Sequence, residues 1–85
     1  MTEVVPSVDA AREFLVQLWR ELLGAPALLP EDNFFGSGGT SIYMKATLEA
    51  LHQKYGVRLE LEALVDYPTA SQLAMRVAHR ETLTI

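Results

Sequence analysis

Residues 32–42 read Asp32-Asn33-Phe34-Phe35-Gly36-Ser37-Gly38-Gly39-Thr40-Ser41-Ile42, a polar, glycine-rich loop that leads into an amphipathic stretch. This pattern predicts that a long helix begins at Ser41. The first backbone N–H groups of a helix have no partner within it and form the positive end of its dipole. A phosphate on the Ser41 oxygen would therefore be stabilised. The alternative is that Thr40 or Ser41 is merely the N-cap of the helix, a common role for Ser and Thr.

Apolar residues at intervals of three and four predict one main helix before this loop and one directly after it. The first should cover about 8–23, with Ser7 as N-cap and Gly24 as C-cap. The second should cover about 41–55 and end at Gly56. The apolar stripe expected on the first helix is Ala11, Phe14, Leu15, Leu18, Trp19 and Leu22, with Trp19 in the core. The stripe expected on the second is Met44, Leu48, Leu51 and Tyr55.

The rest of the chain completes an all-α bundle. Residues 57–61 predict an extended connector into a short helix at about 60–65, which Asp66-Tyr67-Pro68 ends. A capping box, Thr69-Ala70-Ser71-Gln72, begins a last helix to about 80 with apolar face Leu73, Ala74, Val77 and Ala78. The long first loop should be pinned to the core by Leu28, Leu29, Phe34 and Phe35. We therefore expect three main helices plus one short helix, in a single domain over 1–85 whose folded core covers about 7–80, with a short tail at each end.

Composition limits the classes of function. The 85-residue chain is 49% hydrophobic and 21% charged, which is typical of a globular domain, and its net charge of −4 argues against a nucleic-acid partner. No stretch is apolar enough to span a bilayer, and the N-terminus has no signal-peptide pattern, so we expect a cytoplasmic protein. With no cysteine, any thiol chemistry must come from a cofactor.

The loop resembles the attachment-site signature of the thiolation, or peptidyl carrier, proteins of nonribosomal peptide synthesis, D-x-F-F-x-x-G-G-x-S-[LI]. The runs Leu18-Trp19-Arg20-Glu21-Leu22-Leu23-Gly24 and Tyr67-Pro68-Thr69 extend the similarity over about 8–80. The resemblance implies an up-and-down bundle of the acyl-carrier type. It also implies covalent phosphopantetheine on Ser41, beside Gly39 and Thr40. The family more often has His or Asp at the Thr40 position, and carriers of fatty-acid and polyketide systems usually have Asp there, so Thr40 favours the peptidyl branch.

The resemblance further implies partners and a way of working. A phosphopantetheinyl transferase would modify Ser41, and the thiol of the arm would hold aminoacyl or peptidyl groups as thioesters. An adenylation enzyme would load the arm, and condensation, tailoring or thioesterase enzymes would act next. The carrier itself would be no enzyme, and we expect a free-standing monomer. Ile42, Lys45 and Glu49 should face outward and bind partners, unless the short third helix covers Ile42.

Other functions fit the sequence less well. A serine hydrolase needs a base near Ser41, yet His52 lies eleven residues along the same helix, about 16 Å away. His79 remains possible as the base, but the loop lacks the closing glycine of a nucleophile elbow. The glycine-rich loop has no lysine for a P-loop, and no metal-ligand pattern surrounds either histidine. An acyl carrier of a polyketide or fatty-acid pathway, or a small helical adaptor that carries no modification, remain alternatives.

Overall fold

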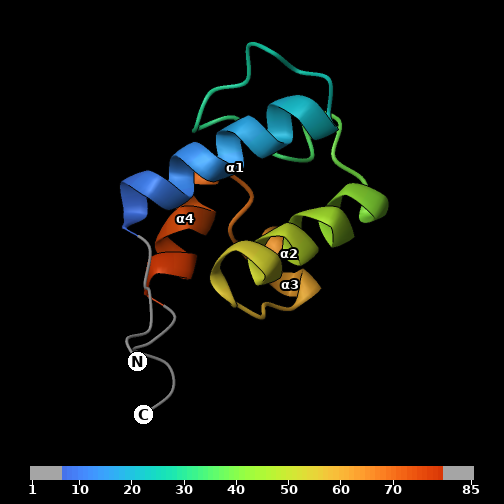
Figure 1. The fold of residues 1–85 in the computed structure, drawn as a ribbon. Helices are drawn as coiled ribbons and strands as arrows, with labels where there is room; N and C mark the ends of the chain where they lie inside the picture. The colour runs from blue at the N-terminus through green and yellow to red at the C-terminus, as the bar shows by residue number, and fades with distance from the viewer. Residues whose placement is uncertain (1–6, 80–85) are drawn as a thin grey trace.

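The computed structural model describes residues 7–79, and these form four helices with one isolated β-bridge between Asn33 and Thr69 (Figure 1). The helices are α1 (Val8–Leu22), α2 (Ser41–Tyr55), α3 (Leu61–Asp66) and α4 (Ala70–Ala78). The prediction of an all-α bundle with three main helices, one short helix and a long first loop is confirmed. The predicted tails lie outside the described residues.

α1 begins and ends through local hydrogen bonds. Ser7 is its N-cap, as predicted, and the Ser7 hydroxyl accepts the Ala10 N–H at 3.0 Å. The C-cap is Leu23 and not Gly24, so this prediction was wrong by one residue. Gly24 follows with φ +61°, a left-handed conformation that glycine adopts without a steric penalty. The Ala25 N–H then donates to the Arg20 carbonyl at 3.0 Å, which satisfies an unpaired carbonyl of the last turn.

The core lies where α1 packs along α4 and crosses α2 (Figure 1). Its buried apolar members are Ala11, Leu15, Val16, Trp19, Leu28, Phe34, Leu51, Val57, Ala63, Leu64, Ala70, Leu73, Ala74 and Val77. The predicted core position of Trp19 is confirmed. On α2 only Leu51 of the expected stripe is fully buried, because the unpredicted Thr47 occupies the central position facing Trp19. The remaining three stripe residues are partly buried against the core: Met44, Leu48 and Tyr55.

The second half of the chain follows the predicted order closely. Gly56 ends α2 with φ +70°, and its N–H donates to the His52 carbonyl at 2.8 Å. An extended connector leads to α3, and Thr69 caps α4 by accepting the Gln72 N–H at 3.1 Å. The capping box is incomplete, because the Gln72 side chain accepts from the Thr69 hydroxyl and not from its backbone N–H. α4 ends at Ala78, short of the predicted limit near 80.

Candidate functional site

The loop before α2 arches over α1 and is fixed at several points (Figure 1). Arg20 Nε of α1 donates to the Leu28 carbonyl at 2.9 Å. From α4, the Ser71 N–H donates to the Pro30 carbonyl at 3.1 Å, and the Ser71 hydroxyl donates to Glu31 Oε2 at 3.1 Å. Although long, the loop is therefore held between two helices.

One carboxylate, from Asp32, and one amide, from Asn33, shape the turn before the glycines. Asp32 Oδ2 accepts the Leu29 N–H at 2.8 Å, while the Asp32 N–H donates to the Leu29 carbonyl at 3.0 Å. Asn33 Oδ1 accepts two successive backbone N–H groups, those of Phe35 at 2.8 Å and Gly36 at 3.1 Å. Such side-chain acceptors replace the backbone partners that a turn lacks, which explains the choice of Asp and Asn here.

The four apolar residues expected to pin the loop divide into two pairs. Leu28 and Phe34 are 3% and 0% exposed, whereas Leu29 and Phe35 are 57% and 39% exposed. The prediction was therefore wrong for Leu29, whereas Phe35 lies outside the core but packs edge-on against the Phe34 ring, with 5.2 Å between the ring centroids. Each directly follows a buried residue, so the loop turns the first side chain of each pair inward and leaves the second closer to solvent.

Phe34 is the anchor that positions the end of the loop. Its ring lies 4.8 Å from the Trp19 ring, centroid to centroid, and its N–H donates to the Pro68 carbonyl at 2.6 Å. The chain then folds back across this ring, where a Cβ added at Gly39 would come within 2.3 Å of Phe34 Cε2. Gly38, at φ +108°, makes the turn that this close approach needs. The entry point of α2 is thus fixed by Phe34.

Ser41 is the first residue of α2, and its side chain is exposed. Thr40 is the N-cap, but its side chain makes no capping hydrogen bond. Among the described residues the Ser41 hydroxyl has no hydrogen-bond partner either. The first turn also contains no acidic side chain that would occupy the positive end of the dipole. The alternative of an N-cap is therefore right for the position of Thr40, which caps without a side-chain hydrogen bond, and it does not apply to Ser41. An anion attached to Ser41 would meet the free N–H groups of the first turn.

Neither histidine lies beside Ser41, because one is far along α2 and the other follows α4, whose end lies across the molecule from the start of α2 (Figure 1). His52 is on the same helix, about 16 Å along it at 1.5 Å per residue. His79 follows α4, and its Nδ1 lies 2.8 Å from the Met75 carbonyl of the preceding turn. The described residues also contain no group of three potential metal-ligating side chains. The site can thus present a hydroxyl, and neither histidine is placed to activate it.

The predicted partner-binding residues lie on the outer side of α2, beginning beside Ser41. Ile42 is 75% exposed, so α3 does not cover it, and the alternative of an ordinary core position is wrong. Lys45 and Glu49 are also exposed. The sequence did not indicate that Leu61 and Val65 of α3 are exposed apolar residues too, at 41% and 59%. A six-residue helix is too short to show a recognisable periodicity.

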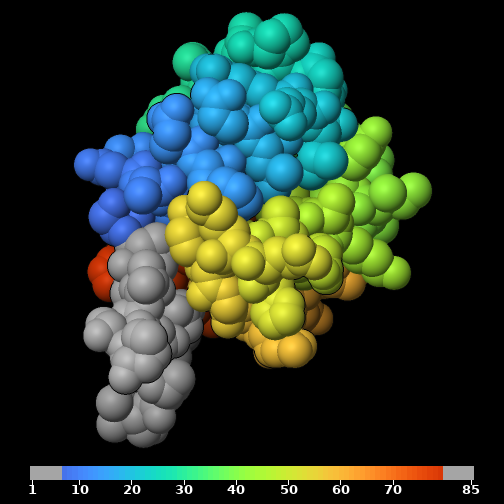
Figure 2. Space-filling view, viewed as in Figure 1, coloured from blue at the N-terminus to red at the C-terminus, as the bar shows by residue number. Residues whose placement is uncertain are grey.

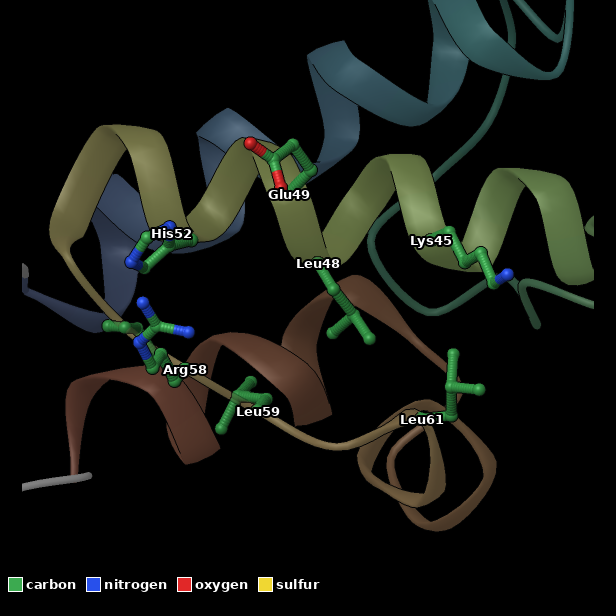
Figure 3. Close-up of a pocket in the computed structure, with 8 residues that line it drawn as sticks. Lys45, Leu48, Glu49, His52, Arg58, Leu59 and Leu61 are labelled. Atoms are coloured by element: carbon green, nitrogen blue, oxygen red, sulfur yellow. The ribbon is translucent and has the colours of Figure 1, made fainter.

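A groove lies beside these residues, between α2 and the segment that runs from the connector into the first residue of α3 (Figure 3). Its volume is about 420 Å³, and it is lined by Lys45, Leu48, Glu49, His52, Val57, Arg58, Leu59 and Leu61. Sequence reasoning missed it because two separate segments form it. Figure 2 shows the α2 face in space-filling form, with the connector against it.

Comparisons with known proteins agree with this geometry. The family described as "Phosphopantetheine attachment site" matches residues 13–77. Tyrocidine synthase 3 of Brevibacillus parabrevis is 41% identical over 64 residues, 75% of this chain but only 1% of that protein. A peptidyl carrier protein, solved in complex with the phosphopantetheine transferase Sfp and coenzyme A, is 35% identical with a TM-score of 0.80, over 91% of this chain and 99% of that one. An active-site mutant of a peptidyl carrier protein is 34% identical with a TM-score of 0.78, over 94% and 88%.

The fold and site therefore define a small carrier domain whose cofactor is phosphopantetheine. The chain belongs to the phosphopantetheine attachment-site family, and its relatives identify it as a carrier of the peptidyl type. It spans 1% to 6% of the length of the synthases of tyrocidine and gramicidin S that it matches. Within residues 7–79, no helix has both the length and the apolar character needed to span a membrane.

Proposed function

We propose that Ser41 is the residue to which phosphopantetheine is attached. The observation that carries this proposal is the exposed Ser41 hydroxyl at the first position of α2, which has no hydrogen-bond partner within residues 7–79. The free N–H groups of that turn would stabilise the phosphate, with Thr40 as the N-cap and Gly39 packed on the Phe34 ring. Residues 7 to about 80 would form one carrier domain.

The bound group supplies a flexible arm ending in a thiol, on which an aminoacyl or peptidyl group is held as a thioester. The protein's own residues have a simpler task. Phe34 and the loop fix the position of Ser41, α2 stabilises the negative charge, and the outer side of α2 is left open to other proteins. We infer that the domain catalyses no reaction itself, because it belongs to a family of carriers and neither histidine lies beside Ser41.

The partner enzymes are inferred from the proteins to which this chain is similar. A solved relative in complex with a phosphopantetheine transferase supports such an enzyme as the partner that modifies Ser41. In that reaction the Ser41 oxygen attacks the phosphorus of the coenzyme A diphosphate that bears the pantetheine. The bond from this phosphorus to the bridging oxygen breaks, adenosine 3′,5′-bisphosphate leaves with that oxygen, and the hydroxyl proton passes to a base of the transferase. The similarity to a tyrocidine synthase supports an adenylation enzyme for loading, and condensation, tailoring or thioesterase enzymes afterwards. Nonribosomal peptide synthesis in the cytoplasm is the proposed setting.

The outer side of α2 is the proposed docking surface, and we define it by Ile42, Lys45 and Glu49. All three are exposed, and they follow Ser41 along one side of the helix. A branched apolar residue that is 75% exposed beside the attachment point would be covered when a partner binds.

The test is the mass of the intact protein after incubation with coenzyme A and a phosphopantetheinyl transferase. We expect a gain of one phosphopantetheine in the wild-type chain and none in Ser41→Ala. Ser37→Ala, from the same loop, is the control and should gain the full mass. A mass gain in Ser41→Ala would overturn the proposed site, and no gain in the wild-type chain would favour an unmodified adaptor.

A further inference from the structure

One of the two lysines of the chain lies beside the attachment point. Both lysines, Lys45 and Lys54, are on α2. Lys45 is four residues after Ser41, about 6 Å along the helix axis and roughly 40° around it. Lys54 is thirteen residues after Ser41, about 20 Å along the axis and roughly 140° around it. Only Lys45 is therefore on the side of the helix that would carry the arm.

The amine of Lys45 is not held by another side chain. Lys45 is exposed, and within residues 7–79 its amine takes part in no ion pair or hydrogen bond. Glu49 is the one carboxylate of α2, and it accepts instead from Gln53 Nε2 at 2.8 Å. The Lys45 side chain extends towards the N-terminal end of α2, where Ser41 lies (Figure 3). The amine is thus directed towards the group that Ser41 would carry.

Lys54 is placed differently, at the other end of the same helix. Its amine lies 5.5 Å from the centroid of the Phe14 ring and 6.0 Å from that of the Tyr55 ring. An ammonium is attracted to the face of an aromatic ring, so these contacts hold the side chain against α1 and the end of α2. Lys54 therefore serves as an internal comparison, a lysine of the same helix that is turned away from Ser41.

The length of the arm separates the two lysines further. From phosphorus to sulfur the arm has about as many backbone atoms as four to five peptide residues, so it spans at most roughly 16 Å. This length reaches Lys45 with slack, whereas Lys54 is farther along the axis and also around the helix. The end of a short flexible tether has an effective concentration in the millimolar range at a site that it can span, and near zero at one that it cannot.

We propose that Lys45 is a second modification site, whose amine takes the acyl group from the thioester on the arm of the same molecule. The inference rests on the proposed attachment at Ser41. The neutral Lys45 amine attacks the thioester carbonyl, a C–N bond forms and the C–S bond breaks. The proton of the amine passes through water to the departing thiolate. The products are an amide on Lys45 and an arm with a free thiol, so no further reactant is needed.

This transfer would change the carrier as well as discharge it. An amide replaces the ammonium of Lys45, so the docking surface of Ile42, Lys45 and Glu49 loses its one positive charge. Because the amide is more stable than the thioester, the transfer is not reversed by the arm. A carrier that stays loaded without meeting a partner would therefore lose its acyl group and alter its own docking surface.

The test uses acetyl-coenzyme A and a phosphopantetheinyl transferase to place an acetylated arm on the full chain. Free acetyl-coenzyme A is removed, the intact mass confirms loading, and the protein is kept at pH 8.5. Hydroxylamine then cleaves the remaining thioester but not an amide, and fragment masses locate the acetyl group that survives. We expect at least about tenfold more acetyl on Lys45 than on Lys54, because the arm does not span the distance to Lys54. Tenfold dilution should leave the rate per molecule unchanged, since the transfer is intramolecular.

Three variants complete the experiment. Lys45→Arg keeps the charge but not the nucleophile and should abolish the surviving acetyl, whereas the matched control Lys54→Arg should retain it. Ser41→Ala, given acetyl-coenzyme A without an arm, should acetylate Lys45 no more than Lys54. No surviving acetyl in the wild-type chain, equal amounts on both lysines, a rate that falls on dilution, or full acetylation of Lys45 in Ser41→Ala would each overturn the inference. Absence of any mass gain at the loading step would instead overturn the attachment at Ser41, so the two failures are distinguishable.

Discussion

Trp19 Nε1 donates a hydrogen bond to Thr47 Oγ1 at 3.0 Å, and both side chains are fully buried. The same hydroxyl donates to the Tyr43 carbonyl at 2.8 Å, within α2. A buried indole N–H needs an acceptor, and Thr47 is the one buried polar residue among those described. This pair therefore fixes the rotation of α2 against α1, and so which side of α2 faces outward.

Thr47→Val keeps the shape of the side chain but removes the acceptor. The buried indole N–H would be left without a partner, which costs about 1–3 kcal/mol of unfolding free energy. We expect a clearly lower melting temperature, measured by circular dichroism. In a Trp19→Phe background, which has no indole N–H, the same change should cost less. Equal costs in the two backgrounds would show that the hydrogen bond contributes nothing.

Gly39→Ala should destabilise the loop, because the new Cβ would lie 2.3 Å from the Phe34 ring. The buried ring would have to move, at a cost of about 1–3 kcal/mol for an overpacked site. We expect both a lower melting temperature and slower modification of Ser41. Gly36→Ala is the matched control, since its Cβ would meet Asn33 Cβ at an ordinary 3.6 Å. If both variants melt like the wild-type chain, the Phe34 contact does not position the loop.

Replacing each of the two serines at helix starts by alanine should change the stability of the protein by different amounts. Ser7 accepts the Ala10 N–H and caps α1, so Ser7→Ala should cost about 1 kcal/mol. The Ser41 hydroxyl caps nothing, so Ser41→Ala should leave the melting temperature almost unchanged while abolishing modification. A stability loss in Ser41→Ala equal to that in Ser7→Ala would mean that Ser41 is a structural cap after all.

Local chemistry explains what the sequence could predict. Ser7, Gly56 and Thr69 mark helix ends through their own hydrogen bonds and backbone angles, so the helices were found within one or two residues. The start of α2 at Ser41 followed from the same kind of pattern. The burial of Thr47 depends instead on Trp19, twenty-eight positions away, which no helical periodicity reveals.

The groove also could not be predicted from the sequence, because its walls come from α2 and from a connector with no regular pattern. His52 is half-buried and lines the groove against Arg58 (Figure 3). The exposure of Leu29 and Phe35 depends on how the loop turns, which the glycines permit but do not specify. Tertiary contacts therefore decide each feature that the residue pattern left open.

Ile42 supplies the sharpest test of the docking surface. It is 75% exposed in the first turn of α2, so its side chain contributes little to the core. An acidic residue in the first turn of a helix interacts favourably with the dipole. Ile42→Asp should therefore keep the wild-type melting temperature, while loading by the adenylation partner becomes slower because an apolar contact is lost. Rates of loading, measured by intact mass over time, check this expectation.

Two further variants separate the possible causes of slower loading. Ile42→Asn removes the apolar contact without adding charge, so it should slow loading as well if the contact itself matters. Gln17→Asp adds the same charge at an exposed position of α1, remote from Ser41 in sequence, and should load at the wild-type rate. Normal loading by Ile42→Asn with slow loading by Ile42→Asp would assign the effect to repulsion by the new carboxylate. Wild-type rates in both Ile42 variants would remove Ile42 from the docking surface, because both would still be folded and exposed at that position.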